Sequence, residues 1–270
     1  MRVSAWSCGL WVCLASVVWS GCASAPKAKG DGLQSEPAPP EPTLRLLTST
    51  VRFASAKEAA ALLGDSDDFT AAMSAFDRQL RTKRVDDVTD AEFRKYAAQS
   101  AVTWTNKDTV AWASTVHQLN EALDGLHLPL PDEVVLVRTD GSEEFGANYT
   151  RQNAIVLPLK DELRDDEHRF GLLAHELFHV ASRHGKDAFR DGAYGLLGFT
   201  AVAKKPWPND VELRRITNPD AHTAHHAVVV TEGETQATVV PVLVSKVSIA
   251  DAILAEPFFS IIDLQLLVTT

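Results

Sequence analysis

Cysteine is almost absent from this chain, and so is any excess of positive charge. The three cysteines, Cys8, Cys13 and Cys22, all lie in the first 22 residues. No disulfide can join two elements after that point and no cysteine-based metal site can form there, so core packing has to stabilise the fold. Lysine and arginine total 26 against 36 aspartate and glutamate residues, giving a formal net charge of −10. This balance argues against nucleic acid as a partner, because nucleic-acid-binding proteins generally present a basic surface.

The N-terminal region is not expected to be part of the folded domain. An apolar stretch over residues 3–19 is short for a transmembrane helix and is followed by Gly21-Cys22. This arrangement resembles the bacterial lipoprotein signal, in which cleavage before the cysteine leaves its thiol carrying a lipid. The resemblance implies a signal peptide over residues 1–21 and an exported chain that Cys22 anchors by lipid in the bacterial envelope, at the outer membrane. Residues 22–42 are rich in proline and alanine, the composition of a tether.

The remainder of the chain, residues 43–270, predicts one α+β domain. Its first part, 43–130, is mainly helical, and its second part, 131–270, carries strands and one long apolar helix. We expect the helical part to pack on a small mixed sheet together with that helix. We expect helices over residues 56–64, 65–81, 90–99 and 106–123, one that starts near 165 or 166 and carries residues 175–179, and one over 188–199. The expected strands cover 133–138, 147–150, 153–157, 227–231 and 235–244.

Apolar spacing and capping residues locate the helices of the first part. Ser55 and Glu58 form the pattern of a capping box. Apolar residues at helical spacing predict one buried face for the helix over 65–81 and another, including Val110, for the helix over 106–123. The members of these two faces are Phe69, Met73, Phe76 and Leu80, then Val110, Ala113, Val116 and Leu119.

The residues that carry chemistry are His175, Glu176 and His179, in a stretch, 170–181, that has no other charged residue. Residues four apart share one helical face, so the two histidines can present imidazoles to one ion at about 2.0–2.1 Å each. Glu176 is placed beside them, where it can take a proton from water. An ionisable triplet in an apolar helix is costly unless an ion or partner compensates it. The H-E-x-x-H pattern resembles the zincin metallopeptidases, which implies Zn²⁺ as cofactor and a peptide or protein as substrate.

The motif alone leaves the third metal ligand undetermined. Metzincins place a histidine six residues after the second motif histidine, where this chain has Gly185. Gluzincins use a glutamate on a following helix, but the next glutamate after the motif is Glu212. Residues 191–195, Asp-Gly-Ala-Tyr-Gly, resemble part of the aspzincin motif of deuterolysin-like endopeptidases. That resemblance implies Asp191 as the third ligand and Tyr194 as a group that polarises the substrate carbonyl.

Other residues remain open as the third ligand. The acids Asp210 and Glu212 are two of them, and a histidine cluster supplies the others. Within that cluster, His226 begins an expected strand and could close the site from the far side. The cluster consists of His222, His225 and His226.

Three hypotheses of function follow from these patterns. The first is a zinc-dependent hydrolase, a metallopeptidase of the cell envelope in which Glu176 activates water. The alternative is a catalytically inactive zincin-like lipoprotein that binds or scaffolds partners. A third is a structural lipoprotein in which residues 43–130 do the work. The presence of both histidines and of the glutamate favours the enzyme.

Lipidation is testable at Cys22. Metabolic labelling with a fatty-acid probe should tag the wild-type chain and leave Cys22→Ser unlabelled, because the thiol is the acceptor of the lipid. Cys13→Ser is the matched control and should label like wild type. Label retained by Cys22→Ser would contradict the expectation.

Overall fold

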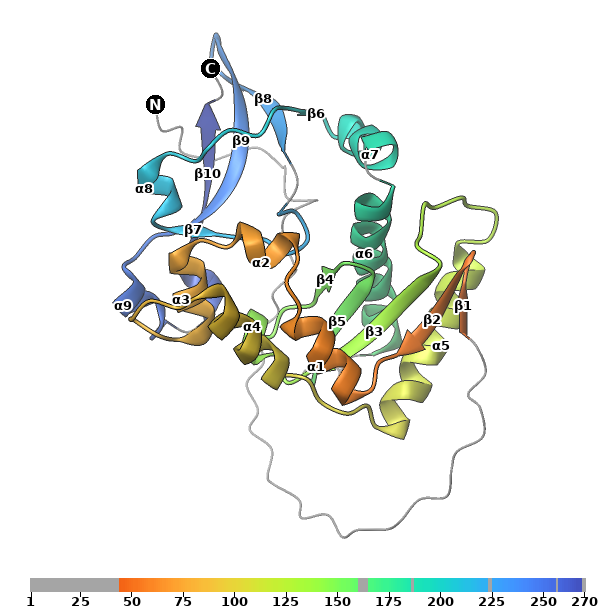
Figure 1. The fold of residues 1–270 in the computed structure, drawn as a ribbon. Helices are drawn as coiled ribbons and strands as arrows, with labels where there is room; N and C mark the ends of the chain where they lie inside the picture. The colour runs from red at the N-terminus through yellow and green to blue at the C-terminus, as the bar shows by residue number, and fades with distance from the viewer. Residues whose placement is uncertain (1–43, 160–164, 186, 223–224, 256, 269–270) are drawn as a thin grey trace.

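The structure is a computed structural model and describes residues 44–159, 165–185, 187–222, 225–255 and 257–268 (Figure 1). The signal peptide, Cys22 and the tether over 22–42 lie outside these residues. Within the described ranges, no helix has both the length and the apolar composition to cross a bilayer. The expected α+β class is confirmed: the described residues form helices, one mixed sheet and one antiparallel sheet.

The first sheet joins strands from both parts of the chain. Its order is β1-β2-β3-β5-β4, in which β2, β3 and β5 are parallel and the two edge strands are antiparallel to their neighbours. The strands β1 and β2, near the start of the described residues, were not expected from the sequence. The five strands are β1 (Leu44–Leu46), β2 (Ser49–Phe53), β3 (Glu133–Thr139), β4 (Tyr149–Arg151) and β5 (Ala154–Pro158).

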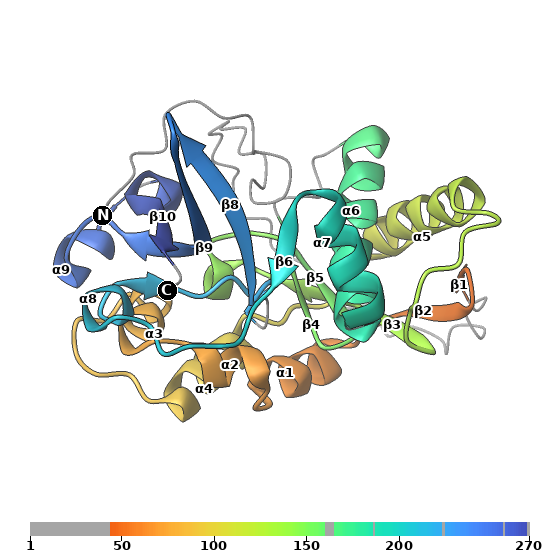
Figure 2. The same ribbon diagram turned by 90° about the horizontal axis from the view of Figure 1, so that it is seen from above.

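Helices cover both faces of this sheet, as the strand sequences require. Residues of β3 and β5 point alternately to opposite faces, and the apolar runs are buried on both sides, which is typical of parallel strands. Val134 and Ile155 pack with helices α5 and α6, whereas Val135 and Val156 pack with α1, α2 and α4 (Figure 2). These helices are α1 (Ala56–Gly64), α2 (Asp68–Ala72), α4 (Asp90–Gln99), α5 (Asn106–Ala122) and α6 (Asp166–His184).

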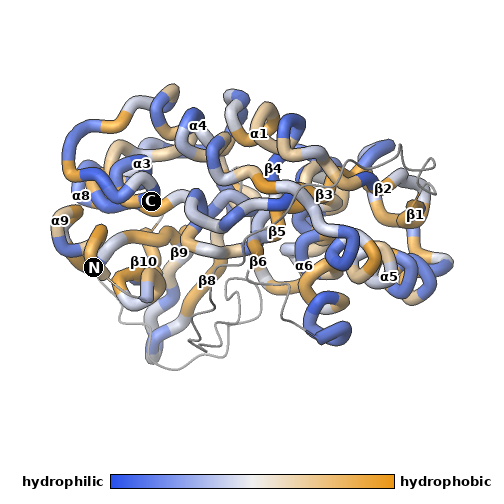
Figure 3. The backbone as a smooth tube through the Cα atoms, turned by 90° about the horizontal axis from the view of Figure 1, so that it is seen from below, coloured by the Kyte–Doolittle hydropathy of each residue, from blue (hydrophilic) through white to orange (hydrophobic). Residues whose placement is uncertain are grey.

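The second sheet is antiparallel and lies beside the first (Figure 1). Its order is β10-β9-β8-β6, and β7 also pairs with β9. The expected hairpin forms between β8 and β9, with Gly233 in the left-handed region at φ 59°. Figure 3 shows the apolar segments of β8 and β9 in orange beside β10. The strands are β6 (Phe199–Ala201), β7 (Arg215–Ile216), β8 (His226–Glu232), β9 (Thr235–Ser245) and β10 (Ile262–Val268).

Short helices complete the described chain around this second sheet. The helix α3 packs its apolar side against β7, α9 and β10 residues, which makes a separate small core. One helix was expected over residues 188–199. The structure instead has a π-helical turn that is followed by the short helix α7, and residue 199 begins β6. The remaining elements are α3 (Ala75–Thr82), η1 (Ser142–Glu144), η3 (Asp187–Asp191), α7 (Gly192–Leu196), α8 (Asn209–Glu212), α9 (Ile249–Ala252) and η4 (Phe258–Ile261).

Two details of the helical part correct the sequence interpretation. Residues 65–81 form two helices, because Ser74 caps α3 and its hydroxyl also donates to the Arg215 carbonyl at 2.8 Å. In α5, Val110 is 71% exposed, and Trp112 takes a place in the core instead. The capping box at Ser55 is confirmed.

Buried guanidinium groups join the helices to the second sheet. Arg81 donates to Asp77 at 2.9 Å and to the Thr217 carbonyl at 2.7 Å, and it pairs with Glu144. Asp77 in turn accepts the Thr217 backbone N–H at 2.9 Å. Arg215 donates to the Ala72 carbonyl at 2.7 Å. These contacts fix the segment Arg215–Asp220, called the 215–220 segment below, against α2 and α3.

Removing Arg81 tests this junction. Arg81→Met leaves two buried carboxylates without their cation, and loss of one partner of a buried ion pair typically costs about 3–5 kcal/mol. For a domain of this size the Tm should fall by roughly 6–20 °C. Arg84→Met, at a side chain 37% exposed, is the control and should change the Tm little. Equal Tm values for the two variants in thermal denaturation would contradict the structural role of Arg81.

Candidate metal centre

Helix α6 carries the motif and is well defined at both ends. Asp165 caps its N-terminus by accepting the His168 N–H, and Asp166 and Glu167 lie in the first turn, where they complement the helix dipole. Leu177 and other apolar residues face the first sheet. Glu176 and His179 lie close to the buried Leu177 on the helix and are themselves buried, at 3% and 9% exposure. His175 is exposed.

The two motif histidines face one another. Their Nε2 atoms are 3.0 Å apart and their rings stand nearly perpendicular, at 79°. Two nitrogens can bind the same zinc ion only if they lie within about 4 Å of each other, twice the usual bond length. Among the described residues none hydrogen-bonds the buried Nδ1 of His179. The two Nε2 atoms are close enough to bind one ion.

Asp220 and Glu176 gather around His179, in a set of possible ligands to which His175 does not belong. Ligand atoms of Glu176, His179 and Asp220 all lie within 4.8 Å of one another, and this is the set of three possible metal-binding side chains found among the described residues. Two carboxylates this close repel each other when both are ionised, and a cation would relieve that repulsion. The group could hold a metal ion.

Asp220 is held in place by residues of β4 and α6. Its Oδ1 accepts the backbone N–H and the hydroxyl of Thr150, both at 2.7 Å. Arg183, one turn after His179, donates to the Thr150 hydroxyl at 2.8 Å and to the Pro219 carbonyl at 3.3 Å. Such contacts behind a metal ligand fix its orientation. They leave Oδ2 as the oxygen that Asp220 can present to an ion.

The protonation state of His179 also suits metal binding. Burial lowers its pKa, and the neighbouring His175 and Arg183 act in the same direction, while the Asp220 carboxylate opposes them. Lowering the pKa favours the neutral imidazole, which is the form that binds a metal.

The residues that the aspzincin resemblance indicated form a second group. Asp191 hydrogen-bonds Nε2 of His226 at 2.8 Å, and this contact is the main cause that lowers the pKa of the carboxyl. The Tyr194 ring lies edge-on to His226, with centroids 4.7 Å apart. Neither Asp191 nor His226 belongs to the set formed by Glu176, His179 and Asp220. The structure therefore brings Asp191 to His226 rather than to the motif.

The other alternative ligands are placed away from the motif or are already paired. Asp210 is exposed on the short helix α8. Glu212 pairs with Arg215 at 2.7 and 3.0 Å. The imidazole of His222 bonds the Pro219 carbonyl at 2.7 Å.

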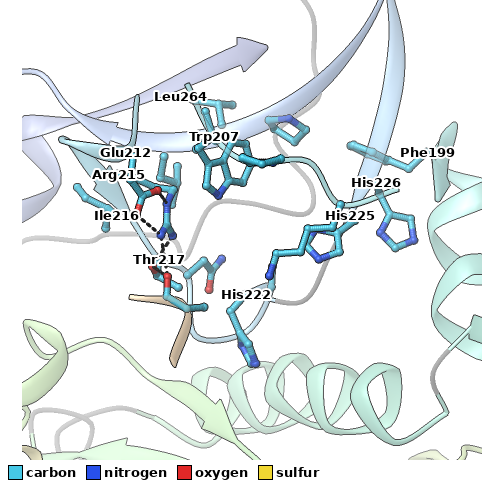
Figure 4. Close-up of a pocket in the computed structure, with 18 of the residues that line it drawn as sticks. Phe199, Trp207, Glu212, Arg215, Ile216, Thr217, His222, His225, His226 and Leu264 are labelled. Carbon is cyan, nitrogen blue, oxygen red and sulfur yellow. Dashed lines mark hydrogen bonds and ion pairs between the residues drawn. The ribbon is translucent and has the colours of Figure 1, made fainter. Parts of the chain in front are cut away.

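A cavity of about 480 Å³ connects the motif with the second group (Figure 4). Its wall includes His179 from α6, Tyr194 from α7 and His226 from β8. The motif histidine and the Asp191–His226 pair thus face the same space, although they do not form one set of ligands.

Nothing in the sequence marks Asp220 as a metal ligand, because it lies in a segment that predicts only a turn. The residues Thr217 to Asp220 predict a surface turn, and Asn218 does accept the Asp220 N–H at 2.9 Å. No motif spacing connects Asp220 with His179, since their approach depends on the tertiary contacts of Thr150 and Arg183.

No protein-family model matches this chain, and neither does any curated protein or solved structure. The resemblance to zincins therefore rests on the motif residues and on their geometry.

The choice between Asp220 and Asp191 is testable by metal content. Asp220→Asn keeps the oxygen that Thr150 holds but removes the anionic ligand, so zinc retained after dialysis should fall roughly tenfold or more, as in His179→Ala. Asp191→Asn is the matched control, since it keeps an oxygen for His226, and should retain zinc like wild type. Full zinc in Asp220→Asn with loss in Asp191→Asn would reverse the assignment.

Proposed function

We propose that this chain is a zinc-dependent hydrolase, a metallopeptidase in which His175, His179 and Asp220 hold the ion. The observation that carries the proposal is the 3.0 Å separation of the two Nε2 atoms, with the Asp220 carboxylate beside His179. Asp220 replaces Asp191, which the sequence had favoured, because Asp191 is engaged with His226.

Glu176 is the general base of the proposed reaction. A zinc ion in this site would polarise the substrate carbonyl and bring the pKa of water that it binds to about 7. Glu176 follows His175 directly, and its carboxylate lies within 4.8 Å of ligand atoms of His179 and Asp220. It is therefore close enough to accept a proton from water at the centre and pass it to the leaving amine.

Tyr194 and the Asp191–His226 pair form the opposite wall of the active site. Tyr194 and His226 line the cavity that His179 also lines, and Asp191 contacts His226. A phenol or imidazole at that wall can donate a hydrogen bond to the oxygen that becomes negative as the carbonyl is attacked. Asp191 orients His226 for this role by fixing one of its ring nitrogens.

The proposed location is the bacterial envelope, with a lipid on Cys22 and the tether over 22–42 between the membrane and the domain. The proposed location and lipid anchor rest on the sequence of the first 42 residues. A peptidase held in this way would act on peptide or protein substrates near the membrane.

Glu176→Gln separates catalysis from metal binding. If Glu176 is the base and not a ligand, this variant should keep wild-type zinc content and Tm, while kcat/KM for a cleaved peptide falls about a hundredfold or more. Zinc content and peptide cleavage are measured on the same preparation.

Three other results would change the assignment. Loss of zinc from Glu176→Gln would make Glu176 a ligand, and unchanged cleavage would require another base. A wild-type chain that binds zinc but cleaves no peptide in a broad library would favour the inactive zincin-like binding protein.

A further inference from the structure

The cavity at the metal centre extends far beyond the motif. From His179 it runs under the second sheet to Leu243 on β9 and Leu264 on β10, with Trp207 on the connecting loop. Figure 4 shows Trp207 and Leu264 at one end and His222 at the other, near helix α6. A group that occupies this cavity therefore lies next to the metal centre.

Much of the far end of the cavity is apolar surface that the fold leaves uncovered. Leu264 is 38% exposed and Leu197, directly after α7, is 44% exposed, and both line the space. Ile216 and Val242 form the deeper wall and are themselves buried. Water in contact with such a wall is released when an apolar group enters, which favours binding.

The guanidinium at this end is already neutralised and fully engaged. Arg215 donates to both oxygens of Glu212, to the Thr217 hydroxyl at 2.8 Å and to the Ala72 carbonyl at 2.7 Å. An acidic ligand would have to displace these bonds. The charge arrangement therefore disfavours a carboxylate at the deep end and favours a neutral, apolar group.

We infer that this cavity is the specificity subsite of the enzyme and takes a large apolar side chain, such as phenylalanine or leucine, beside the scissile bond. The inference rests on the proposed peptidase activity, because His179 connects the cavity to the reacting centre. At about 480 Å³ the cavity falls within the usual range of ligand pockets, roughly 300–1,000 Å³, and has room for an aromatic ring with adjoining backbone.

A peptide series tests the inference on the full chain. The series varies one residue, as Phe, Leu, Gly or Asp, next to the cleaved bond in an otherwise constant quenched-fluorescence peptide. Burial of a large apolar side chain should raise kcat/KM for the Phe and Leu peptides about 10- to 100-fold over the Gly peptide. The Asp peptide should be cleaved no faster than the Gly peptide. Equal rates across the series would overturn the inference, and so would preference for Asp, which would point to the exposed Lys204 at the cavity wall.

A charge placed in the cavity provides the second arm. Leu264→Arg changes a partly exposed lining residue, so the fold should tolerate it; it should lower kcat/KM for the Phe and Leu peptides to that for the Gly peptide in the same variant. Leu254→Arg makes the same change at a leucine that is 80% exposed and does not line the cavity, and it should keep the wild-type profile. An unchanged profile in Leu264→Arg would overturn the inference.

Binding separates failure of this inference from failure of the proposed function. The tripeptide acetyl-Gly-Phe-Gly-amide should change the emission of Trp207 in wild type and not in Leu264→Arg, with Trp207→Phe identifying the reporter. If no peptide is cleaved but this binding is seen, the subsite stands and the peptidase proposal fails. If peptides are cleaved but the Phe tripeptide does not bind, the subsite is overturned and the peptidase proposal stands.

Discussion

Hydrogen bonds from three separate elements hold the 215–220 segment against the rest of the protein. Arg81 and Asp77 of α3 bind Thr217, Thr150 of β4 binds Asp220, and Arg183 of α6 binds the Pro219 carbonyl. Each bond spans a large separation in sequence, so all of them depend on the tertiary fold. The place of Asp220 beside the motif is a consequence of this arrangement, and the proposed chemistry depends on it.

The same arrangement creates an electrostatic demand at the centre. Glu176 is nearly fully buried, the carboxylate of Asp220 lies close to it, and the imidazole of His179 is driven toward its neutral form by burial. A buried anion next to a second anion is unfavourable unless a cation or proton compensates it. A divalent ion would compensate both carboxylates and bind the neutral imidazole of His179.

Local signals in the sequence predicted local structure, and the α+β class followed from their order. The capping box at Ser55 and the hairpin turn at Gly233 depend on near neighbours alone, and both form as expected. The break at Ser74 combines a local N-cap with a contact to the Arg215 carbonyl, far along the chain, and the apolar spacing reveals neither. The partner of Asp191 could not be predicted for the same reason, because His226 lies far along the chain and reaches Asp191 only through the tertiary fold.

The most direct test of the metal centre is a crystal structure of the protein grown with zinc, with anomalous differences collected on both sides of the zinc absorption edge. The account predicts one strong peak that appears above the edge, bonded to Nε2 of His175 and of His179 and to a carboxylate oxygen of Asp220. A peak bound instead by Asp191 and His226, or no peak at the motif under saturating zinc, would contradict it.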